Sequence, residues 1–311
     1  MIPRCSQPAL SGVFAAAAMC WQPSVVFGQG NPYTDALLPK IRAAAQSIPG
    51  PRPRELRYVS LGEARRPVNL SVATSDTQRV TSVLPVFQIR FADRWIMVDA
   101  GLDSMGMVEN LGRMAGAGFP QVRYDSVQLA LRDADAVVLT HEHFDHAIGV
   151  QRGPYFKQVA SKTLVTNAQV QSWLHPPAQG FMRMTADSVS GFRPMDYELV
   201  HAIAPGVVLI KAPGHTPGSQ FVYVRLADDR EILLIGDLVW MMPGLVLNLQ
   251  KPQSEIDKLK EDRAAIQQQM DWVRSILDGK TIAVAPSHDM SQLDALVTQG
   301  VLHVGFDLRR N

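Results

Sequence analysis

Thr140-His141-Glu142-His143-Phe144-Asp145-His146 stands out in this chain of 311 residues, because it holds three of only eight histidines. The stretch begins where the apolar run at residues 134–140 predicts a short buried strand. A strand end is rigid, and the loop beyond it can curl so that alternate side chains converge. Imidazole nitrogens and carboxylate oxygens bind zinc and related divalent cations. We therefore predict that two neighbouring metal sites begin in this loop, which supplies His141, His143, Asp145 and His146.

Three further potential ligands also follow predicted strands. His215 lies in a tight turn rich in Pro and Gly, directly after a strand. Asp237 ends the second strand of a predicted hairpin, and His288 follows the last predicted strand. Because the ends of neighbouring strands meet at a common edge of a sheet, we expect one site assembled from distant loops.

The remaining pattern predicts a mixed sheet covered by helices. Hairpins come early and late with helical segments between them, an order that favours an α/β (α+β mixed) fold over a simple doubly wound sheet. The predicted strands are 86–91, 95–98, 134–140, 163–166, 207–211, 221–226, 232–235 and 281–285. The predicted helices are 126–132, 167–174 and 254–278, the last capped by Ser254 and ended by Gly279.

Together the motifs resemble those of the metallo-β-lactamase superfamily. The resemblance rests on the His-x-His-x-Asp-His run at 141–146, the Gly-His-Thr-Pro-Gly turn at 214–218, Gly236-Asp237 and Ser287-His288. It covers roughly Val86 to His288, most of the chain beyond its N-terminal segment. It implies an αβ/βα sandwich, in which helices cover two mixed β-sheets and the metal site lies along one edge of them.

The resemblance also implies a role for each ligand. The first metal ion would be bound by three histidines, His141, His143 and His215. The second would be bound by Asp145, His146 and His288, and Asp237 would bridge the two ions. Asp99, in Val98-Asp99-Ala100-Gly101, matches a position that supports the ligand loop without binding metal. The expected cofactors are two divalent ions, Zn²⁺ first, with Fe, Mn, Co and Ni as alternatives.

The bridging aspartate favours one branch of the superfamily, which is similar to N-acyl homoserine lactonases and glyoxalase II. True β-lactamases of this fold generally lack that residue, and glyoxalase II carries a helical domain for which the chain ends too soon after His288. The lactonases place a tyrosine three residues after the aspartate, where this chain has Trp240. We therefore expect a dinuclear metallohydrolase that cleaves a lactone or carboxylic ester, with acyl-homoserine lactones among the candidate substrates. Asp145 is the expected catalytic proton donor to the leaving group.

Other functions of the same fold stay open. They include a β-lactamase, a thioesterase, a phosphodiesterase, an enzyme like the mononuclear-iron persulfide dioxygenases, and a non-catalytic binding protein. Glu142, between two ligands, is expected to face solvent or a supporting backbone group. Apolar residues near the ligands are expected either to line a substrate pocket or to be ordinary core: Phe144, Phe181, Met182, Met184, Trp240, Met241 and Met242.

The first 28 residues differ from the rest of the chain. Arg4 is the only charged side chain before Asp35, and an apolar, alanine-rich stretch runs from Ala9 to Trp21. This pattern is typical of a secretory signal peptide cleaved near Gly28, with a disordered extension as the alternative. Cleavage would remove both cysteines and would place the mature chain in the periplasm or outside the cell.

The composition narrows the class of partner. The chain is 46% hydrophobic and 19% charged, as globular proteins are. Its formal net charge of +1 gives no electrostatic reason to expect nucleic acid. No later apolar run is long enough to span a membrane. The expected partner is a small-molecule substrate with an apolar portion, and a homo-oligomer stays open. We expect residues 29–55 to form an N-terminal extension and 56–311 a single domain.

Overall fold

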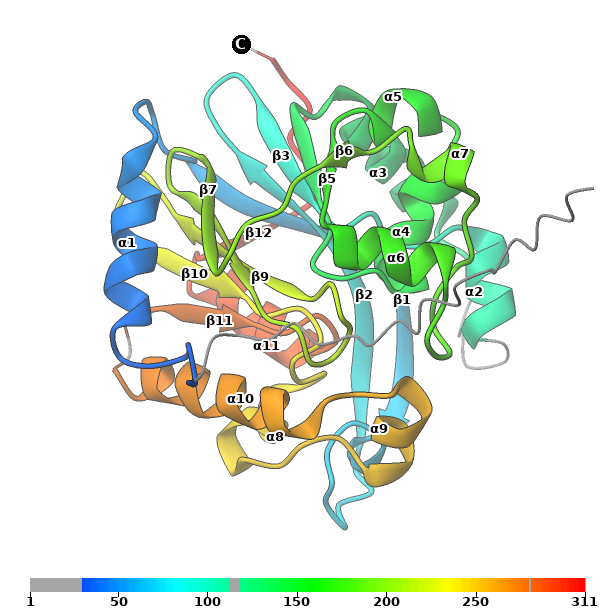
Figure 1. Cartoon of the computed structure of the whole chain (residues 1–311), viewed down its shortest axis with the longest axis vertical. Coiled ribbons are helices and arrows are strands. Elements are labelled where there is room, and N and C mark those ends of the chain that lie inside the picture. The colour runs from blue at the N-terminus through cyan, green and yellow to red at the C-terminus, as the bar shows by residue number, and fades with distance from the viewer. Residues whose placement is uncertain (1–29, 112–117, 280, 311) are drawn as a thin grey trace, which may run out of the picture. The chain divides into compact units, whose positions relative to one another are not determined.

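Two β-sheets lie face to face at the centre of this computed structural model, which describes residues 30–111, 118–279 and 281–310 (Figure 1). The strands of the first sheet are β1 (Glu55–Pro67), β2 (Arg79–Arg90), β3 (Trp95–Val98), β4 (Ala136–Val138), β5 (Thr163–Val165), β6 (Arg193–Pro194) and β12 (Leu302–Val304). Those of the second are β7 (Val200–Ala204), β8 (Val207–Lys211), β9 (Gln220–Arg225), β10 (Glu231–Leu234) and β11 (Ala283–Ala285). The predicted signal peptide, residues 1–28 with both cysteines, lies outside the described residues.

Both sheets are mixed. In the described part of the chain the first has the order β12-β1-β2-β3-β4-β5-β6 and the second β11-β10-β9-β8-β7. Strands β1, β2 and β3 pair antiparallel, whereas β3, β4 and β5 pair parallel. Strands β7 to β10 pair antiparallel, and β11 joins β10 in parallel. The predicted hairpins, β2–β3 and β9–β10, are confirmed.

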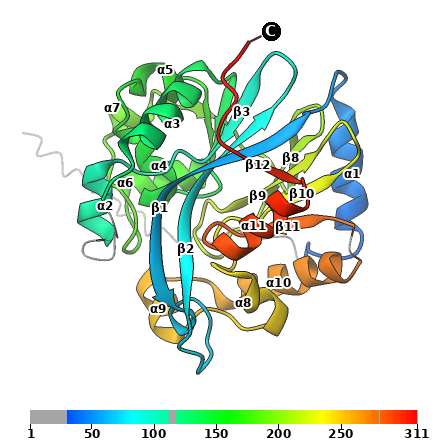
Figure 2. The ribbon, with the colours of Figure 1, turned by 180° about the vertical axis from the view of Figure 1, so that it is seen from behind.

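Helices cover the outer face of each sheet (Figures 1 and 2). The helical elements are α1 (Leu37–Ser47), the short 3₁₀ turn η1 (Val68–Leu70), α2 (Ser104–Leu111), α3 (Gln121–Asp133), α4 (Phe144–Gln151), α5 (Phe156–Ala160), α6 (Asn167–Leu174), α7 (Ala186–Val189), α8 (Met242–Leu247), α9 (Gln253–Leu259), α10 (Arg263–Asp278) and α11 (Met290–Thr298). Among the described helices, none combines the length and the apolar character that crossing a membrane requires.

Side-chain alternation along the strands builds three apolar layers. On β8, Val207 and Leu209 face the core between the sheets, whereas Val208 and Ile210 face the layer under α1 and α10. A third layer lies between the first sheet and α3 to α6. This order of layers is the predicted αβ/βα sandwich, which is therefore confirmed.

Residues 31–55, within the predicted N-terminal extension, contribute to the apolar layers. Contacts group Asn31–Asn311 into one unit, and α1 packs on β7 and β8 with Leu37 and Ile41 fully buried. Helix α1 carries only a few regularly spaced apolar residues and was not predicted from the sequence. Strand β1 was also missed, because its second half carries Glu63, Arg65 and other charged residues that do not read as a strand.

The single helix predicted for residues 254–278 is wrong, because the chain forms two helices there. Lys260 ends α9 in a left-handed conformation (φ 60°), and Asp262 caps α10 by accepting hydrogen bonds from two backbone N–H groups. Ser254 lies inside α9 and does not cap it. The break between the two helices places Glu261 next to the candidate site described below.

Candidate metal centre

The loop after β4 is held by a close approach of helix α4 to the loop after β3. A Cβ on Gly149 would lie 2.0 Å from the carbonyl oxygen of Ala100, so only glycine allows this approach. The backbone N–H of Ala100 donates to the carbonyl of His146 at 2.8 Å, and that of Gly149 donates to Gly101 at 2.8 Å. Helix α4 begins directly after His143 and is therefore fixed with its first turn at the edge of the sheets.

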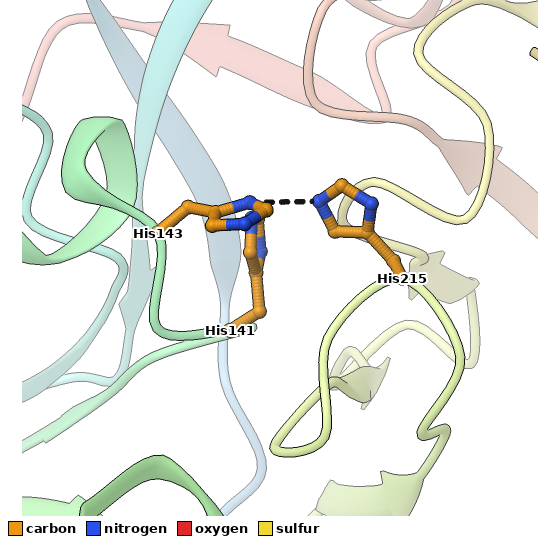
Figure 3. A group of neighbouring side chains, drawn as sticks. All are labelled: His141, His143 and His215. Atoms are coloured by element: carbon orange, nitrogen blue, oxygen red, sulfur yellow. Dashed lines mark hydrogen bonds between the residues drawn. The ribbon is translucent and has the colours of Figure 1, made fainter. Parts of the chain in front are cut away.

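Three buried histidines form the first group of potential ligands (Figure 3). His141 and His143 come from the loop after β4, and His215 from the turn after β8. One ring nitrogen of each lies within 4.8 Å of the others, and Nδ1 of His143 is 3.0 Å from Nε2 of His215. The sequence predicted these three residues as the first set, and the fold brings them together.

A second group shares the carboxylate of Asp237 with the first. Asp145, His146 and His288 place their ligand atoms within 4.8 Å of one another. Oδ1 of Asp237 is 3.4 Å from Nε2 of His146, and its Oδ2 is 3.2 Å from Nε2 of His288 and 3.5 Å from Nε2 of His215. Asp237 therefore lies between the two groups, and all seven predicted ligands meet at one place.

Hydrogen bonds on the outer side of the rings fix their orientation. Nδ1 of His146 is 2.9 Å from Oδ2 of Asp99, and Nδ1 of His288 is 2.7 Å from the carbonyl oxygen of Val83. Nδ1 of His141 is 3.1 Å from Oγ1 of Thr140, which itself donates to Asp99. With the proton held on Nδ1, the lone pair of each Nε2 points inward.

Asp99 makes this arrangement possible through its backbone as well as its carboxylate. It adopts a left-handed conformation (φ 62°), which is uncommon for a residue other than glycine and clusters at functional sites. Its carboxylate accepts from the backbone N–H of Thr140 at 2.7 Å in addition to His146. The sequence prediction for Asp99, a residue that supports the ligand loop, agrees with this position.

The electrostatics of the site suit cations. Burial lowers the pKa of His141 and of His143, so their rings are neutral. Burial alone would raise the pKa of Asp237, but the surrounding imidazoles, His288 first, hold it well below its usual range. Burial would likewise lower the pKa of His146, yet the carboxylates of Asp99, Asp145 and Asp237 outweigh it and raise that pKa.

A second observation also favours metal ions: several of the potential ligand atoms are buried and make no hydrogen bond to a described residue. Within the described residues, Nε2 of His141, Nε2 of His146 and Oδ1 of Asp237 are buried without a hydrogen-bond partner. Such atoms are costly unless something satisfies them. Imidazole nitrogens and carboxylate oxygens converging from two sides are the ligands of Zn²⁺ and neighbouring divalent ions. These residues therefore fit a pair of divalent cations.

Glu142 is not exposed to solvent, which corrects that half of its prediction. Its carboxylate is fully buried and accepts hydrogen bonds from the backbone N–H of Gly218 at 2.9 Å, from Oγ of Ser172 at 2.8 Å and from Oγ1 of Thr216 at 2.7 Å. A backbone partner was expected, and Gly218 is one. Glu142 therefore ties the loop of His141 and His143 to the turn of His215.

Two supporting residues were not predicted. Glu261, in the break between α9 and α10, hydrogen-bonds Nδ1 of His215. Nζ of buried Lys251 lies 2.7 Å from Oε1 of Glu261 and 2.7 Å from the carbonyl oxygen of Asp237. Lys251 and His215 hold the pKa of Glu261 low although burial opposes this. A sequence that reads as one continuous helix gives no signal for Glu261.

Trp240 occupies the place where the lactonases are expected to have tyrosine. Its indole Nε1 donates to Oδ2 of Asp237 at 2.8 Å, and Nζ of Lys251 lies 5.2 Å from the ring centroid. The side chain therefore presents an N–H to the carboxylate between the two groups, and no phenol.

The site opens into a cavity of about 440 Å³. Of the predicted pocket residues, Phe144 and Trp240 line it together with five of the ligands: His143, Asp145, His215, Asp237 and His288. The ring of Phe181 contacts that of His143, with centroids 4.6 Å apart. The predicted methionines pack into hydrophobic clusters instead, so the core alternative describes them: Met182, Met184, Met241 and Met242.

Replacing Trp240 by phenylalanine tests whether its N–H matters. The variant keeps an aromatic ring beside Lys251 but removes the donor to Asp237. We expect about tenfold weaker metal binding, as for other groups that orient a ligand, measured by competition with a chelator. The matched control is Trp272→Phe, an indole in the layer beneath α1. Equal metal affinity in Trp240→Phe and the unmodified protein would contradict the assignment.

Comparisons with known proteins agree with the fold. Residues 86–288 match the family model of the metallo-beta-lactamase superfamily. No curated protein matches the chain by sequence. A solved N-acyl homoserine lactone hydrolase, with N-hexanoyl-L-homoserine at its catalytic metal centre, is 16% identical (TM-score 0.60; 78% of this chain and 96% of that chain covered).

Two other solved structures are similar. An AiiA mutant from B. thuringiensis, with N-decanoyl-L-homoserine at its active site, is 16% identical (TM-score 0.61; 78% and 96% covered). AidC, a dizinc quorum-quenching lactonase, is 13% identical (TM-score 0.53; 79% and 92% covered). At these identities the similarity establishes the fold alone. The family model, in contrast, spans all seven clustered ligands, and this chain belongs to the metallo-β-lactamase superfamily.

Proposed function

We propose that this protein is a dinuclear metallohydrolase that cleaves an ester-like bond in a lactone or a carboxylic ester. The observation that carries the proposal is the position of Asp237, whose carboxylate lies within 3.5 Å of imidazole nitrogens from both groups of potential ligands. A mononuclear iron enzyme would need the first histidine group but not Asp145, His146 and His288, which are clustered here as well.

The residues around the cavity have distinct tasks in this reaction. Two bound divalent cations supply Lewis acidity, which lowers the pKa of water and polarises a carbonyl group. His141, His143 and His215 hold one ion, and Glu261 orients His215 from outside. Zn²⁺ is the proposed ion, and Fe, Mn, Co and Ni take the same donors.

Asp145 is the proposed proton donor to the leaving group. Both Asp145 and Asp237 line the cavity, and the side chain of Asp145 is the more exposed, 13% against 4%. Oδ2 of Asp145 lies 3.6 Å from Nε2 of His288 and 3.8 Å from Nε2 of His146. It therefore stands at the boundary between the metal centre and the space that a substrate would occupy, within reach of a departing oxygen.

Among the substrate classes hydrolysed by enzymes of this fold, we propose lactones and esters for this protein. Three similar structures are lactone hydrolases, and each of them holds an N-acyl homoserine. The cavity has room for a small molecule with an apolar portion, bounded by Phe144, Leu84 and Leu259. Acyl-homoserine lactones fit this description, and β-lactams, thioesters and phosphodiesters are the competing classes.

Metal analysis combined with a substrate panel tests the proposal directly. We expect two equivalents of divalent metal per chain and faster hydrolysis of lactones or esters than of thioesters, β-lactams and phosphodiesters. One equivalent of iron without zinc would replace the proposal with a persulfide dioxygenase-like activity. Two bound metals with no turnover in any class would favour a binding protein.

Asp145→Asn tests the proton-transfer role separately. We expect kcat for an alkyl ester, whose leaving alkoxide needs a proton, to fall by about a hundredfold or more. A phenyl ester leaves more readily as the anion, so its kcat should fall much less. Metal content is measured on the same samples. An equal loss for both esters would show that Asp145 acts as a metal ligand alone.

A further inference from the structure

Charged side chains other than the predicted metal ligands also line the cavity: Arg66, Glu109, Glu255 and Lys258. Glu109 pairs with Arg152 at 3.0 Å, and Glu255 with Lys258 at 3.4 Å. Arg66 makes no side-chain hydrogen bond or ion pair with any described residue, and its Nε is buried. Among these four, the described structure therefore leaves one guanidinium without a partner inside the cavity.

The sheet register fixes how far Arg66 lies from the metal centre. Arg66 on β1 is paired with Val80 on β2, and Val83 on β2 accepts the hydrogen bond from Nδ1 of His288. Three residues along a strand span about 10 Å, so the backbone of Arg66 lies about that far along the sheet from the Val83 carbonyl that holds His288. Figures 1 and 2 show the same ends of β1 and β2 extending beside α9, which carries the other wall.

Strand alternation indicates that Arg66 faces the same space as the ligands. Ser82 and Leu84, two and four residues beyond Val80, line the cavity, so Val80 and its cross-strand partner Arg66 share that face. Val80 also packs in the cluster that contains Trp240, the donor to Asp237. Arg66 is thus connected to the metal centre along one continuous wall.

A half-buried guanidinium without a partner favours an anion. Its planar fork matches a carboxylate with two hydrogen bonds, and a charge-assisted pair is stronger away from bulk water. The cavity lining also includes the apolar side chains of Leu70, Leu84 and Leu259, beside polar ones such as Ser82. A matching molecule would have an ester-like group at one end, an apolar spacer, and an oxyanion at the other.

We propose that Arg66 binds a carboxylate at the far end of the substrate and so selects ester-like substrates that carry an anionic group. The proposal rests on the hydrolase function above and narrows its substrate class. It predicts a preference for a charged acyl chain over a neutral one of equal length. A cavity that selected only for apolar chains would show the reverse.

Monophenyl esters of dicarboxylic acids with six, eight and ten carbons test this directly. Each is compared with the ester of the same length whose free carboxylate is replaced by a carboxamide. For at least one length, we expect kcat/KM to be about ten- to a hundredfold higher for the carboxylate, mainly through KM. In Arg66→Gln the ratio between the two esters should fall to about one, and taking the ratio cancels any general loss of activity.

The neighbouring residue on β1 provides the matched control. Arg65 is exposed, and its guanidinium bonds the carbonyl oxygen of Arg79 outside the cavity. Arg65→Gln removes the same charge from the same strand and should keep the preference for the carboxylate. A preference that survives in Arg66→Gln, or that is absent from the unmodified protein at every length, would overturn the proposal.

Binding measurements separate this proposal from the hydrolase function. Calorimetry on the metal-loaded protein compares octanoate, with one carboxylate, and octanedioate, with two. We expect octanedioate to bind at least about tenfold tighter, and Arg66→Gln to remove this gain. If no ester is hydrolysed but this gain appears and is lost in the variant, the hydrolase proposal fails and the Arg66 site stands. If the esters are hydrolysed with equal kcat/KM and the gain is absent, the Arg66 site fails alone.

Discussion

Replacing Asp237 by asparagine is expected to lower kcat/KM for ester hydrolysis by about a thousandfold or more and to reduce bound metal from two equivalents to one or fewer. The carboxylate oxygens of Asp237 approach imidazole nitrogens of both groups, at 3.4 Å from His146 and 3.5 Å from His215. Asparagine keeps one oxygen and loses the negative charge. A metal ion contributes several kcal/mol to transition-state stabilisation, and each 1.36 kcal/mol is tenfold in rate.

The measurement is metal content after dialysis together with steady-state kinetics. Asp307→Asn is the control, because Asp307 is an aspartate paired with Arg309 and does not line the cavity. It should keep both metal equivalents and the original kcat/KM. If Asp237→Asn retained two metals and full activity, Asp237 would not connect the two groups and the dinuclear proposal would be wrong.

Asp237 could be predicted from the sequence, and so could the six other clustered ligands. Each follows a predicted strand, and strand ends are fixed by local apolar patterns that a single sequence shows well. Four of the seven lie within six consecutive residues, 141–146, so their proximity needs no knowledge of the tertiary fold. The prediction of His215 and His288 as ligands depended on the resemblance and on the rule that the ends of neighbouring strands meet at one edge of a sheet.

The supporting residues could not be predicted in the same way. Glu261 reaches His215 only because the chain turns at Lys260, and a left-handed lysine has no sequence signature comparable to that of glycine. Lys251 is buried because Glu261 and the carbonyl of Asp237 are near it, and such pairing is a tertiary property. The role proposed for Arg66 likewise depends on the register of β1 and β2, which the sequence alone does not show.

Glu142→Ala is expected to lower the free energy of unfolding by about 3–5 kcal/mol, a large effect for a residue proposed to bind no metal. The substitution removes the acceptor of the Gly218 backbone N–H and of the Ser172 and Thr216 hydroxyls, and leaves an empty space in place of the carboxylate. Each buried donor left without an acceptor costs about 1–3 kcal/mol. The hydroxyls can turn to other acceptors, which keeps the total below the sum of three such costs.

Urea unfolding of the metal-free protein measures this effect without any contribution from metal binding. Glu142→Gln is the control, because it keeps the shape and one carbonyl oxygen, and Thr216 can accept a hydrogen bond from its amide. Burial raises the pKa of the Glu142 carboxyl although its three donors oppose the shift, so a neutral side chain is tolerated better here than at an exposed ion pair. We expect Glu142→Gln to lose less than half as much stability as Glu142→Ala. Equal losses would mean that the negative charge, rather than the acceptor geometry, holds the two ligand loops together.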